Sequence, residues 1–316
     1  MCKHAFLIIA HNEFYVLQRL VQVLDDCRND IYVHFDKKVS LLPTLECHNA
    51  RLFILGDEER VNVIWGTVSQ IRTELSLFSC AKKNGPYKYY HLLSGVHLPL
   101  WNLDDLYEFY EKEYPSEIMS LWNSPEEEAD FKLRRYHFGR QWMKSKRRTL
   151  RSLGAFVWRA CLFVQKKLGI RCNKKQTFVK ASNWLSLSEN AVSYLLEKRH
   201  QLEKMYKYAF CPDEYFVPTI LSGHPDKFKI SNVSNLLYVR FYKANPLEVT
   251  MEDYEQKRMT SFMYARKFTE KHMDVVDRVV NNISRRGGDM KKKIAAIVIA
   301  YHPQADELEK NMLGCR

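Results

Sequence analysis

Short apolar runs alternate with helix-patterned segments through roughly the first 120 residues. Residues 5–10 form an unbroken apolar run, which is typical of a strand that is buried on both faces. Residues 14–24 repeat apolar side chains with the spacing of one helix face. This alternation predicts an α/β fold of packed layers with a mostly parallel central sheet. Further strands are predicted at residues 31–34, 51–55 and 89–93, and further helices at residues 67–83 and 103–113.

Polar residues stand where three of the predicted strands end. His11 follows the first strand, Asp36 follows the second, and Ser94, Gly95 and His97 follow the fourth. The carboxyl ends of parallel strands share one edge of a sheet, where ligands bind in folds of this class. We therefore expect these five residues to lie around one site.

A basic segment of about residues 141–175 interrupts the pattern. Its apolar stretch, residues 153–164, contains Arg159 and is too short and too charged to span a bilayer. Two interpretations stay open. The segment is either a basic amphipathic helix that lies on an anionic membrane surface, or an insertion whose apolar face packs on its own domain. The flanking basic residues are Lys144, Lys146, Arg147, Arg148, Arg151, Lys166, Lys167, Arg171, Lys174 and Lys175.

The pattern changes again after Gly287-Gly288. A lysine run leads into one apolar strand at residues 294–300, and a helix pattern at residues 305–313 follows. One strand with one helix cannot bury both faces of the strand. We therefore predict one domain over residues 1–286, followed at residues 287–316 by a linker and the truncated start of a second domain. A C-terminal strand added to the sheet edge is the alternative.

The charge narrows the choice of partners. The chain carries 49 Lys and Arg against 37 Asp and Glu, a net charge of +12. Such a surplus favours nucleic acids, anionic lipids or phosphorylated substrates. A basic nucleic-acid-binding protein is thus one alternative. The sequence contains no helix-turn-helix, zinc-finger or RNP signature, so we expect no nucleic-acid partner.

The cysteines and the start of the chain suggest a compartment. None of the eight scattered cysteines forms a C-x-x-C pair, so we expect no metal site. Met1-Cys2-Lys3-His4 leads directly into the first predicted strand, without a signal-peptide pattern. We expect reduced cysteines and a cytoplasmic protein, with peripheral contact at the inner face of the membrane through the basic segment.

Five motifs in a fixed order extend this picture. Together they resemble the family that holds the core-2/I-branching β-1,6-N-acetylglucosaminyltransferases and the protein xylosyltransferases. The resemblance covers about residues 5–268, whereas the tail resembles the start of a second, rhamnosyltransferase-like glycosyltransferase. The motifs are the strand ends at residues 6–12 and 31–38, His91-Leu92-Leu93-Ser94-Gly95-Val96-His97-Leu98-Pro99-Leu100, Ser182-Asn183-Trp184-Leu185-Ser186-Leu187-Ser188, Cys211-Pro212-Asp213-Glu214 and Tyr264-Ala265-Arg266-Lys267-Phe268.

The resemblance implies a GT-A-like, Rossmann-type fold and a UDP-sugar donor. Glu214 matches the catalytic base of the family, while Asp213 suits the first turn of a helix. Arg266 and Lys267 match a basic pair that holds the donor diphosphate in the branching enzymes, which need no metal. The sequence contains no Asp-x-Asp triplet, the usual metal-binding motif of GT-A enzymes. We therefore expect no metal and no cofactor other than the donor itself.

Other residues take their expected roles from the same resemblance. Asp36 matches an aspartate on the nucleotide side, although a turn aspartate that bonds local backbone is equally expected. Arg134 and Arg135 fall in the acceptor loop. Trp184 is either a stacking platform for a sugar or a core side chain. His97 stands where the family usually has aspartate, so the resemblance does not identify the donor sugar.

The expected reaction is an inverting, metal-independent transfer. A sugar such as N-acetylglucosamine or xylose would move from a UDP-sugar to a hydroxyl of a glycan or lipid-linked glycan acceptor during surface-polysaccharide assembly. The family has a further diphosphate-binding arginine about two dozen residues before the basic pair, where this chain has none; Lys243 or Arg240 are candidates to replace it. This departure and His97 keep a degenerate, non-catalytic transferase open as an alternative.

Overall fold

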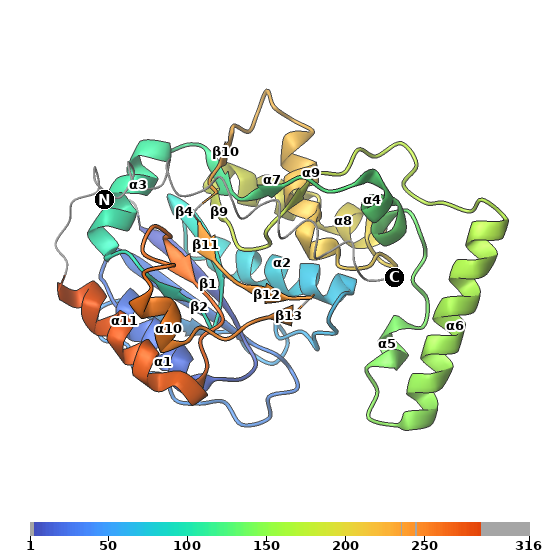
Figure 1. Cartoon of the computed structure of the whole chain (residues 1–316). Helices are drawn as coiled ribbons and strands as arrows, with labels where there is room; N and C mark the ends of the chain where they lie inside the picture. The colour runs from blue at the N-terminus through green and yellow to red at the C-terminus, as the bar shows by residue number, and fades with distance from the viewer. Residues whose placement is uncertain (1–2, 235, 244, 286–316) are drawn as a thin grey trace.

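The computed structural model of the chain describes residues 3–234, 236–243 and 245–285. Its centre is a mostly parallel seven-stranded sheet (Figure 1), as the alternating pattern predicts. The tail at residues 287–316 lies outside the described residues, so the linker and second domain stay predictions. The strands are β1 (His4–Ala10), β2 (Asn29–Phe35), β3 (Arg51–Ile54), β4 (Tyr89–Ser94), β6 (Glu117–Met119), β9 (Ser186–Ser188) and β10 (Ile230–Asn232).

The strands of the large sheet follow the order β10-β6-β9-β4-β1-β2-β3. β1 pairs in parallel with both β2 and β4, and β9 runs antiparallel between β4 and β6. Ala10 pairs with Phe35 and Ile9 pairs with Ser94, so β1, β2 and β4 end nearly level. Their shared end, the carboxyl edge of the sheet, therefore gathers the residues that follow each strand.

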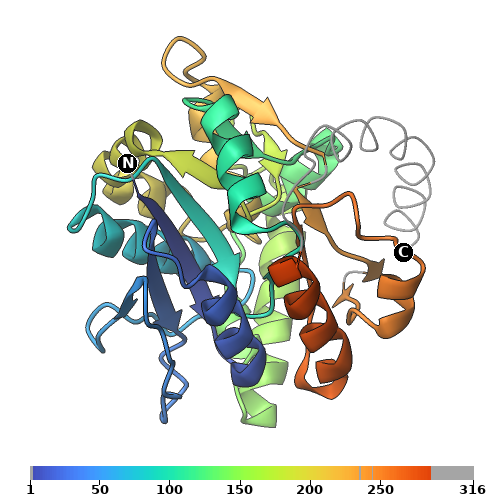
Figure 2. The same ribbon diagram turned by 90° about the vertical axis from the view of Figure 1, so that its left-hand side faces the viewer.

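Two hydrophobic cores lie on the two faces of the sheet. Side chains of β1 alternate between them: Phe6 and Ile8 enter one core, and Ala5 and Leu7 enter the other. α1 and α11 lie side by side on the first face (Figure 2). The helices of the first core are α1 (Phe14–Leu24), α3 (Leu103–Glu113) and α11 (Met273–Arg285); those of the second are α2 (Val68–Lys82), α7 (Glu189–Glu197), α8 (Arg199–Met205) and α9 (Phe216–Ser222).

A small second sheet lies beside the carboxyl edge. It contains β11 (Leu237–Tyr238), β14 (Tyr264–Ala265) and β5 (Leu98–Pro99), with β14 in the middle. β14 is antiparallel to β5, and the Phe268 backbone N–H donates to the Val96 carbonyl at 3.1 Å. Residues 266–267 are thereby placed next to the loop that follows β4.

A long insertion leaves and re-enters the body through one strand pair. β7 (Leu121–Trp122) pairs antiparallel with β8 (Lys180–Ala181), and residues 123–179 lie between them. α5 and α6 stand away from the sheet (Figure 1). The helices of the insertion are α4 (Glu126–Leu133), α5 (Arg140–Met143) and α6 (Arg148–Lys167). The remaining elements are η1 (Pro212–Glu214), β12 (Phe241–Tyr242), β13 (Asn245–Pro246), α10 (Met251–Glu255) and η2 (Glu270–His272).

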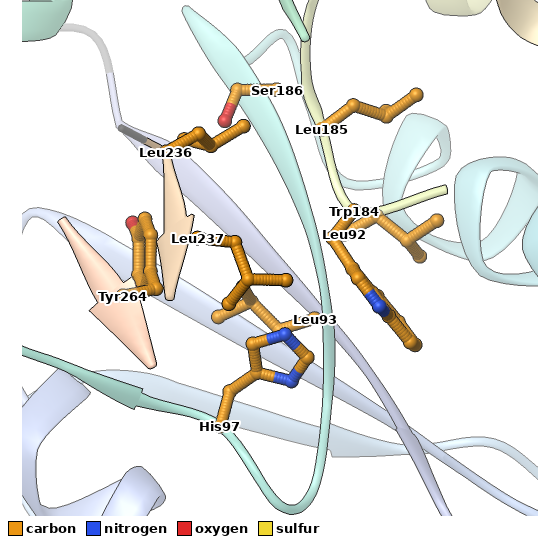
Figure 3. Close-up of a pocket in the computed structure, with 9 residues that line it drawn as sticks. All are labelled: Leu92, Leu93, His97, Trp184, Leu185, Ser186, Leu236, Leu237 and Tyr264. Atoms are coloured by element: carbon orange, nitrogen blue, oxygen red, sulfur yellow. The ribbon is translucent and has the colours of Figure 1, made fainter. Parts of the chain in front are cut away.

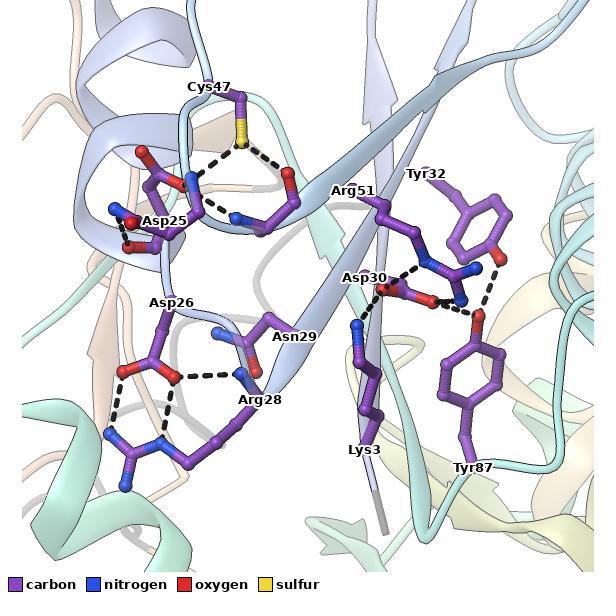
Figure 4. Close-up of polar contacts among 12 residues, drawn as sticks. Lys3, Asp25, Asp26, Arg28, Asn29, Asp30, Tyr32, Cys47, Arg51 and Tyr87 are labelled. Carbon is purple, nitrogen blue, oxygen red and sulfur yellow. Dashed lines mark hydrogen bonds and ion pairs between the residues drawn. The ribbon is translucent and has the colours of Figure 1, made fainter. Parts of the chain in front are cut away.

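The amino-terminal ends of β1 and β2 meet a network of paired polar groups (Figure 4). Asp30 is buried and accepts hydrogen bonds from Lys3 at 2.9 Å and from Arg51 Nε at 3.0 Å. The Tyr87 hydroxyl also donates to Asp30 and shares a 2.7 Å hydrogen bond with Tyr32. Burial opposes the charge of Asp30, but Arg51, Tyr87 and Lys3 together outweigh it and lower its pKa.

No helix in the described part of the chain is long and apolar enough to cross a membrane. The elements predicted before residue 120 are all present, with ends that differ by at most a few residues. The helix predicted around residues 153–164 begins earlier and ends later, at Arg148 and Lys167.

Candidate active site

The carboxyl edge brings together the residues that follow β1, β2 and β4. The Asp36 backbone N–H donates to the Ala10 carbonyl at 2.9 Å, and the Gly95 N–H donates to the Ile9 carbonyl at 2.9 Å. His11 is within electrostatic reach of Asp36 and of the basic pair that follows β14. Burial, followed by the charge of Lys267, lowers the pKa of His11, and Asp36 opposes this effect. The edge therefore contains both a carboxylate and cations.

Asp36 closes the turn after β2. One carboxylate oxygen accepts from the Lys38 backbone N–H at 2.9 Å, and the other lies 3.0 Å from the Lys38 ammonium. Arg60 donates to the carbonyls of Phe35, Asp36 and Val39 and fixes this turn. Asp36 thus has the local role of a turn aspartate, and it is buried at the carboxyl edge.

The loop after β4 depends on close packing. A Cβ on Gly95 would lie 3.2 Å from Ala10 Cβ, so glycine allows β1 and β4 to approach here. His97 is fully buried, and its Nδ1 accepts from the Ser94 backbone N–H at 3.0 Å. Burial, and then Arg266, hold the pKa of His97 well below its ordinary value. The ring is therefore neutral, and its Nε2 has no hydrogen-bond partner among the described residues.

Arg266 and Lys267 directly follow β14. The Arg266 guanidinium lies over the Trp184 ring, 5.0 Å from its centroid, and its Nε is buried without a hydrogen-bond partner in the described structure. Burial lowers the pKa of Arg266 to about 10, so the group is still a cation at neutral pH. Neither Arg266 nor Lys267 forms an ion pair with any described residue. The edge thus presents two cations that have no ion-pair partner within the described part of the chain.

Trp184 contacts both the Arg266 guanidinium and the His97 ring. Its ring centroid lies 4.8 Å from that of His97 in an edge-to-face arrangement, and only 9% of the residue is exposed. Trp184 is therefore mainly a buried side chain that supports Arg266. A cavity of about 10 Å³ beside it is too small for a sugar (Figure 3). Its lining residues are Leu92, Leu93, His97, Trp184, Leu185, Ser186, Leu236, Leu237 and Tyr264.

Glu214 ends the short helix η1, which begins at Pro212. Its Oε2 accepts from Lys132 at 3.0 Å and lies 3.6 Å from the Lys180 ammonium. Glu128 contacts both lysines at 2.7 Å, so two carboxylates and two ammonium groups alternate in a cluster. The Glu214 side chain is 27% exposed, and its Oε1 has no hydrogen-bond partner among the described residues. One oxygen is thus fixed and the other is open to a ligand.

Burial and charge oppose each other within this cluster. Burial alone would lower the pKa of Lys132, but Glu214 and Glu128 outweigh it and raise that pKa. Burial likewise works against ionisation of Glu128, yet the two lysines lower its pKa to about 2. Lys132 and Lys180 were not singled out by the sequence analysis. The only local signal was the helical i, i+4 spacing of Glu128 and Lys132.

Asp213 lies beneath Glu214. The predicted helix start is present, but the Asp213 side chain is buried and accepts from Gln70 at 2.7 Å. The side-chain amide oxygen of Gln70, Oε1, in turn accepts from the Gly66 backbone N–H. Burial, and then Glu214, raise the pKa of Asp213 to about 7. Nearby Glu74 is completely buried, and burial followed by Asp213 raises its pKa well above its ordinary value.

The predicted acceptor residues Arg134 and Arg135 hold the insertion in place. Arg134 forms an ion pair with Glu126 and donates to the Gln176 carbonyl at 2.9 Å. Arg135 contacts Asp130 at 3.1 Å and donates to two carbonyls near the end of α6. Both guanidinium groups therefore have protein partners, and their role toward an acceptor stays a prediction.

Of the two candidates to replace the missing arginine, Arg240 is already paired. Its Nη2 lies 2.6 Å from Asp253 and also donates to the Glu248 carbonyl. Lys243 stacks over the neighbouring Tyr242 ring at 5.6 Å and forms no ion pair within the described residues. Lys243 is thus the candidate of the two that has no competing anion.

The segment from Lys180 to Trp184 links the two halves of the site. Lys180 contacts Glu214, and Trp184 supports Arg266. Four residues of extended chain span at most roughly 14 Å. The carboxylate cluster and the basic pair are therefore connected through this short segment.

Comparison with known proteins identifies the family. The sequence profile of the Core-2/I-branching enzymes matches residues 4–277, which contain the sheet, the insertion, η1 and β14. Among solved structures, the apo form of mouse xyloside xylosyltransferase 1 is similar, with 12% identity and a TM-score of 0.36 over 85% of this chain and 95% of that chain. The comparison with curated proteins gave no match. The chain belongs to the Core-2/I-branching enzyme family, and it is a glycosyltransferase.

Proposed function

We propose that the protein is an inverting, metal-independent glycosyltransferase that uses a UDP-sugar. The acceptor would be a hydroxyl of a glycan or lipid-linked glycan in surface-polysaccharide assembly, and the sugar N-acetylglucosamine, xylose or a similar residue. One observation carries the proposal: at the carboxyl edge of the sheet, within electrostatic reach of His11, Arg266 and Lys267 have no ion-pair partner among the described residues. A diphosphate would supply the anion that these two cations lack.

The basic pair suits a diphosphate in geometry and charge. The planar guanidinium of Arg266 can donate two parallel hydrogen bonds to phosphate oxygens, and Lys267 adds a point charge. Both would neutralise the charge that develops on UDP as it leaves. The described His, Cys, Asp and Glu residues contain no group of three that could hold a metal ion. Metal independence itself is tested by chelation.

Glu214 supplies the second part of the reaction. As the acceptor oxygen attacks the anomeric carbon, its proton would pass to Glu214 Oε1 and the bond from the sugar to UDP would break. Lys132 and Lys180 hold Oε2, which orients the carboxylate. One base without a nucleophile implies a single displacement, and therefore inversion at the anomeric carbon.

His97 distinguishes this site from the family pattern. With Nδ1 accepting from Ser94, its neutral ring would offer a donor at Nε2, whereas an aspartate would offer acceptors. We propose that the donor sugar differs accordingly from those of the branching enzymes.

The six cysteines at described positions are free thiols, which supports a reducing, cytoplasmic setting for the reaction.

A screen of UDP-sugars tests the proposal. Thermal shift and donor hydrolysis are measured in EDTA, with UDP as reference and random-sequence DNA as the control polyanion. At least one UDP-sugar should stabilise the protein and be hydrolysed slowly. Binding of UDP without hydrolysis or transfer would support the degenerate transferase. Tight binding of DNA without binding of UDP would favour the nucleic-acid alternative.

A further inference from the structure

Helix α6 packs along one side on the preceding part of the insertion, residues 136–143. Gly154 crosses Gly139 closely, because a Cβ on Gly154 would lie 2.9 Å from the Gly139 carbonyl oxygen. Trp158 Nε1 donates to His137 at 2.9 Å, and Gln165 donates to the Tyr136 carbonyl at 2.9 Å. Positions 154, 158 and 165 share one helix face, so this anchored face faces the protein.

The opposite side of α6 carries a second apolar stripe. Phe156 and Phe163 are 70% and 63% exposed, and Leu153 and Val164 are 51% and 48% exposed. At 100° per residue these four side chains lie within one face, away from the anchored face. Leu168, at the end of the helix, is also 70% exposed. Contiguous exposed apolar side chains on a soluble protein mark an interaction surface.

The charge around this stripe has one sign. Residues 141–175 contain eleven Lys and Arg and no Asp or Glu, whereas the rest of the chain has 38 Lys and Arg against 37 acidic residues. Nearly all the excess positive charge therefore belongs to this segment. Of these eleven, only Arg171 forms an ion pair within the described part of the chain, with Asp130 at 3.0 Å.

The basic side chains border the stripe. On the helix, Arg159 and Lys166 lie within roughly 60° of Phe163, and Arg148 falls on the same flank as they do. All three are exposed. The Lys167 ammonium lies over the Phe163 ring at 5.8 Å. An apolar stripe with a cationic border on a helix is the pattern of proteins that bind in the headgroup region of a bilayer.

We propose that this outer face of α6 docks on an anionic phospholipid bilayer. Phe156 and Phe163 would enter the boundary between headgroups and acyl chains, while the long cationic side chains reach the lipid phosphates. The charge complementarity selects this occupant: the uncompensated surplus suits an extended surface of negative charge. Docking does not depend on the proposed reaction. If α6 docks in this way, both interpretations of the basic segment apply, because one stripe packs on the protein and the other contacts lipid.

Flotation of the full chain with vesicles tests the proposal. Vesicles of phosphatidylcholine alone are compared with vesicles that also contain phosphatidylglycerol, at low and high salt. We expect binding only to the anionic vesicles, with a loss at high salt because screening shortens the reach of the charges. Phe156→Ser with Phe163→Ser should weaken binding roughly tenfold or more. Neutralising the border with Arg148→Gln, Arg159→Gln and Lys166→Gln should have a similar effect.

Matched controls separate this face from general properties of the chain. Leu41→Ser removes another exposed apolar side chain, at 85% exposure, and should leave binding unchanged. Lys227→Gln, Lys229→Gln and Lys257→Gln remove the same charge elsewhere and should weaken binding less than the border variant. Equal losses in control and border variants would overturn the proposal, because any basic surface would then serve.

Two further measurements keep the proposal falsifiable if a variant folds poorly. Hydrogen exchange of the wild-type chain should slow at residues 148–168 when anionic vesicles are added, and no change there would contradict docking by α6. Light scattering reports the oligomeric state. A dimer that is lost on Phe156→Ser with Phe163→Ser, without binding of the wild type to anionic vesicles, would assign this face to a second copy of the chain and overturn the membrane proposal.

Discussion

The two ends of the central sheet treat charge in opposite ways. At the amino end, buried Asp30 is satisfied by Lys3, Arg51 and Tyr87 (Figure 4). At the carboxyl edge, Arg266 and Lys267 have no ion-pair partner among the described residues. The same strands, β1 and β2, connect both ends.

The difference separates stabilising polar groups from ligand-binding ones. Burying a charge without a partner costs free energy, so a folded protein usually pairs it or leaves it in water. A half-buried cation without an ion-pair partner among the described residues is therefore a candidate to bind an anionic ligand. Asp30 is a fully buried anion with protein partners, whereas Arg266 and Lys267 are half-buried cations without an ion-pair partner among the described residues, and this difference distinguishes the site from the scaffold.

The largest expected effect comes from Glu214→Gln. If Glu214 is the base, turnover should fall by roughly 100-fold or more while UDP affinity stays nearly unchanged, because a base acts mainly in the transition state. Initial rates and calorimetric UDP titration measure the two quantities. Glu252→Gln, an exposed substitution, is the control. Near-normal turnover of Glu214→Gln would remove the catalytic role.

Arg266→Met breaks the comparison at the carboxyl edge. UDP affinity, measured in EDTA, should fall roughly tenfold to 100-fold, because a charge-assisted hydrogen bond contributes about 1.5–3 kcal/mol. The protein without UDP should become more stable, since a half-buried cation that has no ion-pair partner among the described residues is removed. Lys229→Met is the control for loss of a surface charge. If chelation abolishes UDP binding of the wild type and Mn²⁺ restores it, metal independence is wrong.

Asp30→Asn tests the comparison at the amino end, where the variant should lose stability rather than gain it. Breaking this network leaves Lys3 and Arg51 unpaired, and both have substantial access to water. We therefore expect a loss of about 2 kcal/mol in the free energy of unfolding, below the range for fully buried pairs. The pKa of Asp30 is lowered, so its stabilisation is present above the unfolded pKa near 4 and is lost as the pH falls. Urea titration at neutral and acid pH measures this, and a change in UDP affinity would contradict the separation of the two ends.

Asp213→Asn should have the smallest effect, and one that depends on pH. The pKa of Asp213 is raised to about 7, so the folded state holds a proton that the unfolded state releases near pH 4. The stabilisation is complete below the unfolded pKa and is lost as the pH rises through about 7. An asparagine side chain does not titrate in this pH range. The variant should therefore gain a few degrees of melting temperature relative to wild type between pH 5 and pH 8. If the melting temperatures of Asp213→Asn and wild type change with pH in parallel, the buried, raised-pKa carboxyl is not Asp213. The same gain for exposed Asp226→Asn would also contradict this role of Asp213.

The sequence predicted the layers because apolar periodicity is local. β1, α1 and α3 follow directly from spacing, and the strand ends place His11, Asp36 and His97 at one edge. The partners of Glu214 could not be predicted this way. Lys132 precedes Glu214 by 82 residues, and only the closure of the insertion brings them into contact.

Helix α6 illustrates a second limit of prediction from the sequence. Its sequence contains two apolar stripes, and periodicity does not say which one the protein covers. The structure distinguishes them through the close crossing of Gly139 and Gly154 and the bond from Trp158 to His137. Asp213 is a similar case, because a helix start in the sequence does not reveal whether its side chain faces water or the core.

The strand pair β7 and β8 has a consequence for how the chain can vary. Because Trp122 pairs with Lys180, the ends of the insertion are fixed, while Ala129 and Leu133 of α4 pack in the second core. Closing a loop of twice the length adds only about 0.6 kcal/mol of entropic penalty. The α5–α6 hairpin can therefore lengthen, shorten or change its sequence with little effect on the register of the strands, provided that α4 keeps Lys132 in place. The molecule thus has one region where change is thermodynamically tolerated, directly joined to a site where change is not.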